Sequence, residues 1–290
     1  MLDRILRRTG HDAPDDAAAK LDAFERFLRL HIAAWSLVSL AFRVDGTIET
    51  GTPEIVWRGL ATVGLLGTVG APPRLDRYAR PLAAALVCGL VATSFPSTSN
   101  HGFYGALLAV ALLVLRGGPA PTTAAYLRAT VLLVCFGAGL QKALHGTWWR
   151  GSFLAWEVFA SARFETGIGW MLSDAALSRL FDMPGDAVGA GPYVLSFGPA
   201  LVASWAVVVG EIALPVVALV DRARRVAAVA MLGLVGGFEL VAHEVLFGGL
   251  FAALLSLFFP ARIVRWWLGA VAALYLVRGA IFVSTGGATW

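Results

Sequence analysis

The amino-acid sequence predicts an all-α, polytopic integral membrane protein, a bundle of about eight to nine transmembrane helices. Composition is the first reason: 58% of the residues are hydrophobic and only 14% are charged, whereas a soluble domain carries about 25% charged residues. The second reason is a series of apolar runs of about 16–25 residues, close to the length that crosses a hydrocarbon core of about 30 Å. The third is that many arginines stand in the short connections between these runs, as in other membrane proteins.

The expected elements begin with a polar, basic N-terminal segment at residues 1–20, followed by a single transmembrane domain at residues 21–290. The first span is expected from about Asp22 to Phe42. The later spans are expected at residues 54–70, 79–95, 101–116, 123–145, 195–220, 225–244, 246–260 and 265–284.

The distribution of arginines predicts the orientation of the chain. Arginine-rich connections alternate with arginine-poor ones, and the N-terminal arginines fall on the rich side. The rich connections contain Arg74, Arg77 and Arg80, then Arg116, then Arg222, Arg224 and Arg225, and finally Arg262 and Arg265. Because positive residues favour the cytoplasmic side, we expect a cytoplasmic N-terminus in a cell (inner or plasma) membrane. The net charge is only +4 and the basic residues are scattered through short connections, so we do not expect nucleic acid as a partner.

The one long connection, residues 146–194, is expected on the outer face and is rich in tryptophan and phenylalanine. Aromatic residues at this density are typical of the membrane–water interface. Two short interfacial helices are expected at 152–164 and 173–182, the second opened by Ser173 or Asp174 as an N-cap. This connection either covers a site as a lid or anchors the protein at the interface.

Lys142 is the most informative single residue. It is one of only two lysines in the chain and ends an apolar run of helix length. A charged side chain at membrane depth is costly, which makes it a functional-site candidate. The alternative is a lysine near a helix end whose ammonium reaches the headgroups.

Further polar residues stand at the predicted outer ends of three spans, so the topology brings them to one depth and predicts a site near the outer face. Glu239 and His243 are four residues apart and share a helix face. Each of these residues alone could be a solvated interfacial side chain. The spacing does not match a zinc site, and no metal is expected. The outer-end group is Asn100, His101, Lys142, His145, Glu239, His243 and Glu244.

Two more charges lie inside apolar runs. Glu211 is expected about two thirds of the way down its span, where it must be protonated or paired with a cation. We interpret it as a structural hydrogen bond between two helices. Arg128 is close enough to the inner surface to extend to the headgroups, and no catalytic role is expected for it.

The segment Phe136–Gly151 resembles the Ala-Gly-x-x-Lys-Leu…Trp-x-x-Gly signature of the vitamin K-dependent gamma-carboxylase and its wider family, the horizontally transferred transmembrane (HTTM) domain proteins. Three further segments fit in order, and the resemblance covers roughly residues 20–285. These segments are Ser99–Leu108 with its Asn-His pair, the basic turn Asp221–Arg225, and Phe238–Phe251.

The resemblance implies that Lys142 is the base that deprotonates vitamin K hydroquinone, and that Asn100 and His101 position or polarise the quinol. The quinol anion then reacts with oxygen, and the strong base so formed abstracts a proton from a glutamate side chain, which adds carbon dioxide. Reduced vitamin K or menaquinol is the implied cofactor. The expected partners are the bilayer, a hydrophobic quinol or lipid, and a peptide or partner protein on the outer face. The residues expected to bind the cofactor are His243, Glu239, His145 and Trp148.

This chain departs from the carboxylase in ways that affect the expected function. It ends at Trp290 without the carboxylase's large luminal domain, and it has Glu239 where the family often has histidine. We therefore expect a gamma-carboxylase-like lyase or oxygenase chemistry without the luminal peptide-binding part. The alternative is a non-enzymatic quinone- or lipid-binding subunit or scaffold. A transporter is disfavoured because the polar residues gather at one face instead of lining a path through the midplane.

Overall fold

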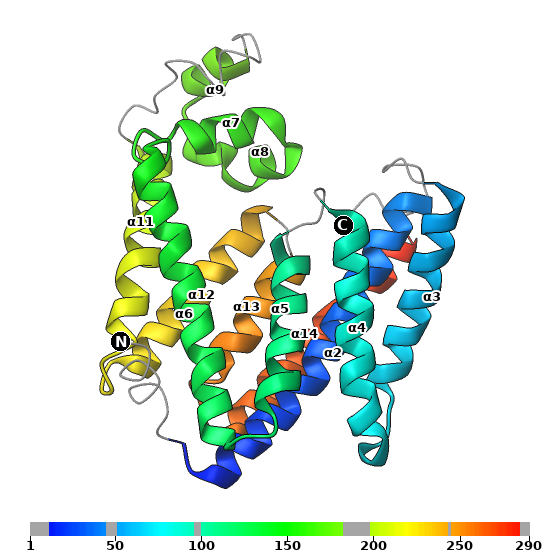
Figure 1. Cartoon of the computed structure of the whole chain (residues 1–290). Coiled ribbons are helices and arrows are strands. Elements are labelled where there is room, and N and C mark those ends of the chain that lie inside the picture. The colour runs from blue at the N-terminus through cyan, green and yellow to red at the C-terminus, as the bar shows by residue number, and fades with distance from the viewer. Residues whose placement is uncertain (1–11, 45–50, 96–99, 182–197, 243–244, 285–290) are drawn as a thin grey trace. The chain divides into compact units, whose positions relative to one another are not determined.

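A computed structural model of the chain describes residues 12–44, 51–95, 100–181, 198–242 and 245–284 (Figure 1). These residues form helices and turns and contain no strand, which confirms the all-α prediction. The chain divides into two compact units, residues 1–128 with 245–290 and residues 129–244. The division falls inside one helix, α6 (Ala120–His145). The single domain expected at 21–290 stays a prediction.

The first unit is built around α2, which contacts α3, α5, α13 and α14. Its other close pairs are α3 with α4, α4 with α5, and α13 with α14. The bounds are α2 (Pro14–Val44), α3 (Thr52–Val69), the 3-10 turn η1 (Pro73–Leu75), α4 (Asp76–Ser94), α5 (Asn100–Leu115), α13 (Val245–Ser256) and α14 (Ala261–Ser284).

Helix α2 begins earlier than the sequence predicted. It starts at Pro14 and carries Asp15 and Asp16 in its first turn, where a fixed proline φ and negative charges both favour helix formation. The carboxylate of Asp16 also accepts a hydrogen bond from the backbone N–H of Ala261 at 2.9 Å. Residues 14–20 of the predicted N-terminal segment 1–20 therefore belong to the first helix.

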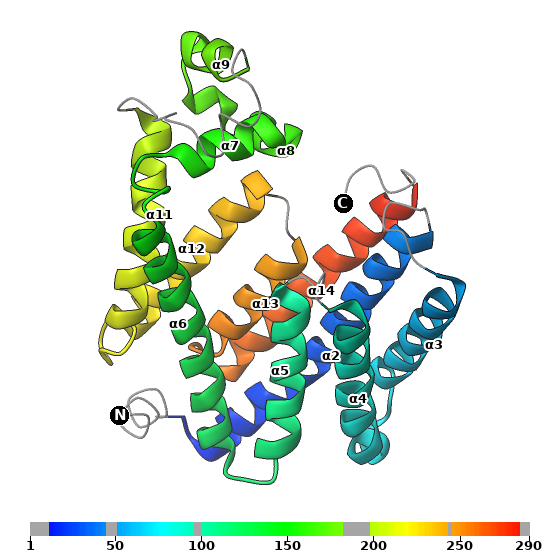
Figure 2. The ribbon, with the colours of Figure 1, turned by 45° about the horizontal axis from the view of Figure 1, so that its top comes forward.

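Helices α2 and α14 lie side by side and run in the same direction (Figures 1 and 2). The Asp16–Ala261 hydrogen bond sets their register at one end. Further along, His31 Nδ1 and Tyr275 Oη share a hydrogen bond of 2.9 Å, and the Tyr275 hydroxyl donates to the Leu246 carbonyl of α13 at 3.2 Å. His31 and Tyr275 are both buried. A buried polar contact thus holds three helices of this unit together.

Gly249 is required where α13 meets this contact. A Cβ at that position would lie 2.3 Å from Tyr275 Oη and 2.7 Å from its nearest ring carbon. Gly249→Ala should therefore displace Tyr275 and lower the free energy of unfolding by about 1–2 kcal/mol. Gly269→Ala is the control, because a Cβ at Gly269 meets nothing within 4 Å. Unfolding in a detergent titration gives the free energy of unfolding of both variants. Equal values for the two would contradict the role of Gly249.

The buried arginines of the first unit are paired with carboxylates. Arg58 donates to Glu54 at 2.8 Å, and Arg29 donates to Asp76 at 3.0 Å. Arg128 is only 2% exposed and lies 2.8 Å from Asp12. Arg128 is thus neutralised inside the protein, and the expectation that its guanidinium extends to the headgroups is wrong.

The second unit contains the rest of α6 and the segment that follows it. The short helices α7, α8 and α9 occur where the sequence predicted two interfacial helices, with Asp174 as the first residue of α9. Packed pairs are α7 with α8, α8 with α12, and α11 with α12. The bounds are α7 (Ser152–Ala160), α8 (Ala162–Ile168), the 3-10 turn η2 (Gly169–Met171), α9 (Asp174–Phe181), α11 (Pro199–Val217) and α12 (Arg224–Ala242).

Four helices among the described residues are long and apolar enough to cross a membrane: α2, α6, α11 and α14. Every predicted span overlaps a helix, but α5 has 16 residues and α13 only 12. At a rise of 1.5 Å per residue, a helix like α13 covers about 18 Å, well short of a hydrocarbon core of about 30 Å. The expected count of eight to nine spans is therefore not supported.

Candidate functional site

Lys142 and Glu211 form an ion pair in the second unit. The Lys142 ammonium donates to both oxygens of the Glu211 carboxylate, at 2.7 Å to Oε1 and 2.6 Å to Oε2. The side chains are 20% and 12% exposed. Lys142 is in the last turns of α6 and Glu211 is in the second half of α11. A lysine and a glutamate from two apolar helices thus neutralise each other away from bulk solvent.

Gly139 allows the two helices to approach closely enough for this pair. A Cβ on Gly139 would lie 2.8 Å from Glu211 Cβ and 3.0 Å from its backbone carbonyl carbon. Small residues at such crossings let membrane helices pack backbone against backbone. Gly139 and Lys142 are three residues apart and therefore share one face of α6.

The turn after α6 brings the chain back onto α11. Gly146 and Gly151 have φ angles of 73° and 68°, a left-handed backbone conformation that glycine adopts without steric cost. Between them, the backbone carbonyl of Trp148 accepts a hydrogen bond from Ser204 Oγ at 2.6 Å. Because Lys142 meets Glu211 and Trp148 meets Ser204, α6 and α11 are antiparallel.

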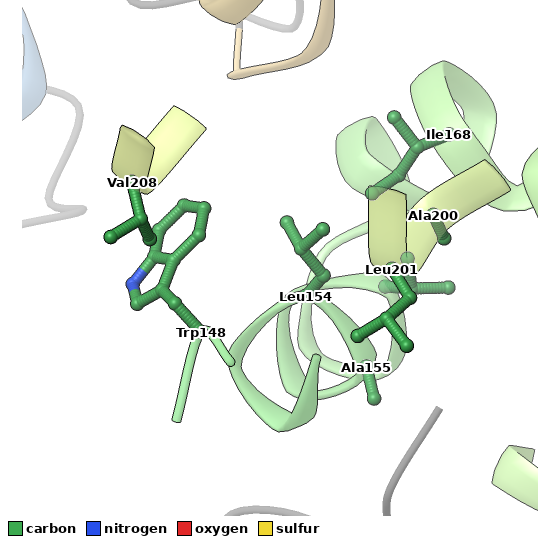
Figure 3. Packing of buried hydrophobic residues seen from close by; sticks show 8 residues of the cluster. Trp148, Leu154, Ala155, Ile168, Ala200, Leu201 and Val208 are labelled. Carbon is green, nitrogen blue, oxygen red and sulfur yellow. The ribbon is translucent and has the colours of Figure 1, made fainter. Parts of the chain in front are cut away.

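The indole of Trp148 lies next to the ion pair. Lys142 Nζ is 5.1 Å from the centroid of the Trp148 ring, within the range of a cation–π interaction. Trp148 is only 5% exposed and stacks on Phe153, with 4.6 Å between ring centroids. Figure 3 shows Trp148 beside Val208 of α11 and Leu154 of α7. This apolar cluster fixes the aromatic wall of the site.

The pair has one transferable proton. A lysine ammonium with a carboxylate and a neutral amine with a carboxylic acid have the same net charge, and burial disfavours any state with an unbalanced charge. Lys142 can therefore accept a proton from a bound acid only after its ammonium has given up the proton that it already holds. Glu211 is the neighbouring group that can take it.

The structure places the other predicted site residues less completely. His145 is the last residue of α6 and is exposed. Asn100 and His101 open α5 in the first unit, and Glu239 lies in α12 of the second. The side chains of those three are not described, and His243 and Glu244 lie outside the described residues. The predicted gathering of these groups around Lys142 stays a prediction.

Sequence reasoning missed the pairing of Lys142 with Glu211 and the role of Gly139. The predicted spans put Lys142 at the outer end and Glu211 deeper. In the structure, the first turns of α11 pack against α7: Ala200 and Leu201 share a buried cluster with Leu154. This brings Glu211 to the level of Lys142. The available signal was charge balance, because Glu211 is the only ionisable residue in α11 and required a cation.

The described part of the chain is all-α, and its four long apolar helices are compatible with a membrane protein. Within that part, no group of three or more His, Cys, Asp or Glu side chains gathers as metal ligands. No family model matches the chain, and no curated protein or solved structure matches it significantly.

Proposed function

We propose that this protein is a multi-pass membrane enzyme of the HTTM type, with Lys142 as the base that deprotonates a hydrophobic quinol or lipid. The observation that carries the proposal is the Lys142–Glu211 pair, 2.6–2.7 Å between ammonium and carboxylate, beneath the indole of Trp148. An ionisable pair among apolar helices is expensive, and such residues are most often functional. The cell membrane, the cytoplasmic N-terminus and the site near the outer face are parts of this proposal.

Glu211 completes the base in this mechanism. Lys142 faces the acid and accepts its proton, while Glu211 takes the proton that the pair held before. The net charge of the site is then unchanged, because the quinol anion replaces the Glu211 carboxylate as the negative group beside the Lys142 ammonium, which stabilises it. Asn100, His101 and His243 would supply further hydrogen bonds to the quinol, and Glu239 would orient His243.

The residues around Lys142 fit a quinol. The apolar cluster around Trp148 gives the site an apolar surrounding, which suits a hydrophobic quinol. The Lys142 side chain is 20% exposed, which leaves part of it accessible to a bound molecule. A bound quinol supplies the acidic hydroxyl and reacts with oxygen once deprotonated. Reduced vitamin K and menaquinol are the cofactors to test first.

The test is aerobic incubation of the purified protein in nanodiscs with reduced vitamin K or menaquinol, with quinone epoxide measured by mass spectrometry. Wild type should form epoxide. Lys142→Arg should lose at least about 100-fold in rate, because general-base catalysis contributes about 10²–10⁴ and arginine stays protonated. Lys142→Ala also loses the base, but it leaves Glu211 without a counter-charge and could fail to fold. Lys142→Arg retains the positive charge beside Glu211 and is therefore the variant that tests the base in a folded protein.

Epoxide formation that survives in Lys142→Arg would contradict the role of Lys142 as base. Absence of epoxide in wild type, with quinone still bound, would favour a second candidate function. That candidate is a non-enzymatic quinone- or lipid-binding subunit or scaffold, in which the Lys142–Glu211 pair holds α6 against α11. The strong mutual neutralisation of the pair favours it, and Lys142→Arg would then bind quinone within a few-fold of wild type.

A further inference from the structure

A groove in the first unit runs between α2 and α14. Its volume is ≈ 580 Å³, and the end of α3 contributes Val69 to the wall. Most of the lining is apolar, and the charged lining residues are Asp22, Arg26 and Arg265. A second hollow of ≈ 530 Å³ shares Arg265 and Gly269 with the groove and adds Arg262 and Trp266. The two hollows therefore form one surface along the start of α14.

The charge of this surface is not balanced by the residues that the structure describes. Asp22 is the acidic residue of the wall, and its carboxylate is already paired with Arg116. Among the described residues, Arg26, Arg262 and Arg265 have no ion-pair partner, and all three are exposed. By contrast, Arg58 and Arg128, two buried arginines of the same unit, each have a carboxylate oxygen at 2.8 Å. The groove arginines thus differ from the structural ones.

From this arrangement we infer that the α2–α14 groove binds an anionic phospholipid, with Arg26, Arg262 and Arg265 on the phosphate and an acyl chain along the apolar wall. Guanidinium groups match phosphate oxygens in geometry and charge. Trp266 is 76% exposed beside the arginines, and tryptophan prefers the depth of the lipid headgroups. The apolar wall favours a lipid over free phosphate, because free phosphate has no acyl chain to contact it.

The test uses the full chain, purified and delipidated in detergent, with binding measured by native mass spectrometry. The probes are phosphatidylglycerol, phosphatidylcholine and inorganic phosphate. Wild type should bind phosphatidylglycerol at least about tenfold more tightly than phosphatidylcholine, because each of the three arginines near an anionic headgroup contributes up to about fivefold. The double variant Arg26→Gln/Arg265→Gln should lose this preference.

Two further variants isolate the site from general charge. Arg74→Gln/Arg77→Gln removes the same charge elsewhere in the first unit and should leave the preference within about twofold of wild type. Gly269→Leu places a bulky apolar side chain in the groove, and its Cβ meets nothing within 4 Å. It should weaken phosphatidylglycerol binding about fivefold or more, since each buried apolar group contributes to affinity.

Three results would overturn the inference. One is a preference for phosphatidylglycerol that persists in Arg26→Gln/Arg265→Gln. Another is an equal loss in Arg74→Gln/Arg77→Gln, which would indicate unspecific attraction to a positive surface. The third is evidence that the apolar wall has no role, either from inorganic phosphate binding as tightly as phosphatidylglycerol or from Gly269→Leu binding like wild type.

Discussion

Glu211→Leu should lower the free energy of unfolding by about 3–5 kcal/mol, because it leaves the ammonium of Lys142 buried without a counter-charge. The pair is 20% and 12% exposed, so solvent can screen it only in part. Lys142→Met should be destabilising for the same reason, with the carboxylate left alone. The double variant Lys142→Met/Glu211→Leu removes both charges and should cost much less than the sum of the two single changes.

A double-mutant cycle measures this coupling directly. Unfolding free energies of wild type, both single variants and the double variant give the interaction energy, which we expect at about 2–3 kcal/mol. Asp22→Leu is a suitable control, because the 58% exposed Asp22 should contribute little through its ion pair with Arg116. Additive effects of Lys142→Met and Glu211→Leu would show that the two side chains do not depend on each other.

The positions of the helices could be predicted from the sequence because apolar runs and polar connections alternate clearly. Even the short helices α7 and α9 fell inside the predicted ranges. The number of membrane crossings could not be predicted in this way. The segments that form α5 and α13 are apolar, but burial inside the protein requires apolar residues just as contact with lipid does. All residues of α13 with described side chains except Phe247 are buried, so packing in the first unit explains its composition without a membrane crossing.

The candidate site was predictable in part. Lys142 stood out because a rare lysine ended an apolar run, and Trp148 because it followed in the same motif. The pairing of Lys142 with Glu211 depends on how far α6 and α11 are offset along their axes, and the predicted bounds of the spans do not contain this offset. The chain from Gly146 to Gly151 folds back and lets α11 start beyond the end of α6, and no periodicity in the sequence reports that offset.

Gly139→Leu should be as damaging as loss of the ion pair, with a decrease of about 3 kcal/mol in the free energy of unfolding. The new side chain would occupy space now filled by Glu211 Cβ and Ile212 Cγ1, which lie 2.8 Å and 2.9 Å from the site of its Cβ. Part of the obstacle is the backbone of α11, 3.0 Å away, so a rotamer change cannot relieve it and the helices must separate.

Gly137→Leu is the matched control for Gly139→Leu. Gly137 is on the same helix, is exposed, and a Cβ there meets nothing within 4 Å. This change should leave stability within about 0.5 kcal/mol or raise it, because leucine favours helix more than glycine does. Separation of α6 and α11 would also pull Lys142 from Glu211, so Gly139→Leu should abolish the coupling measured in the double-mutant cycle while Gly137→Leu preserves it. If both variants retained the coupling, the close approach at Gly139 would not be what brings the ion pair together.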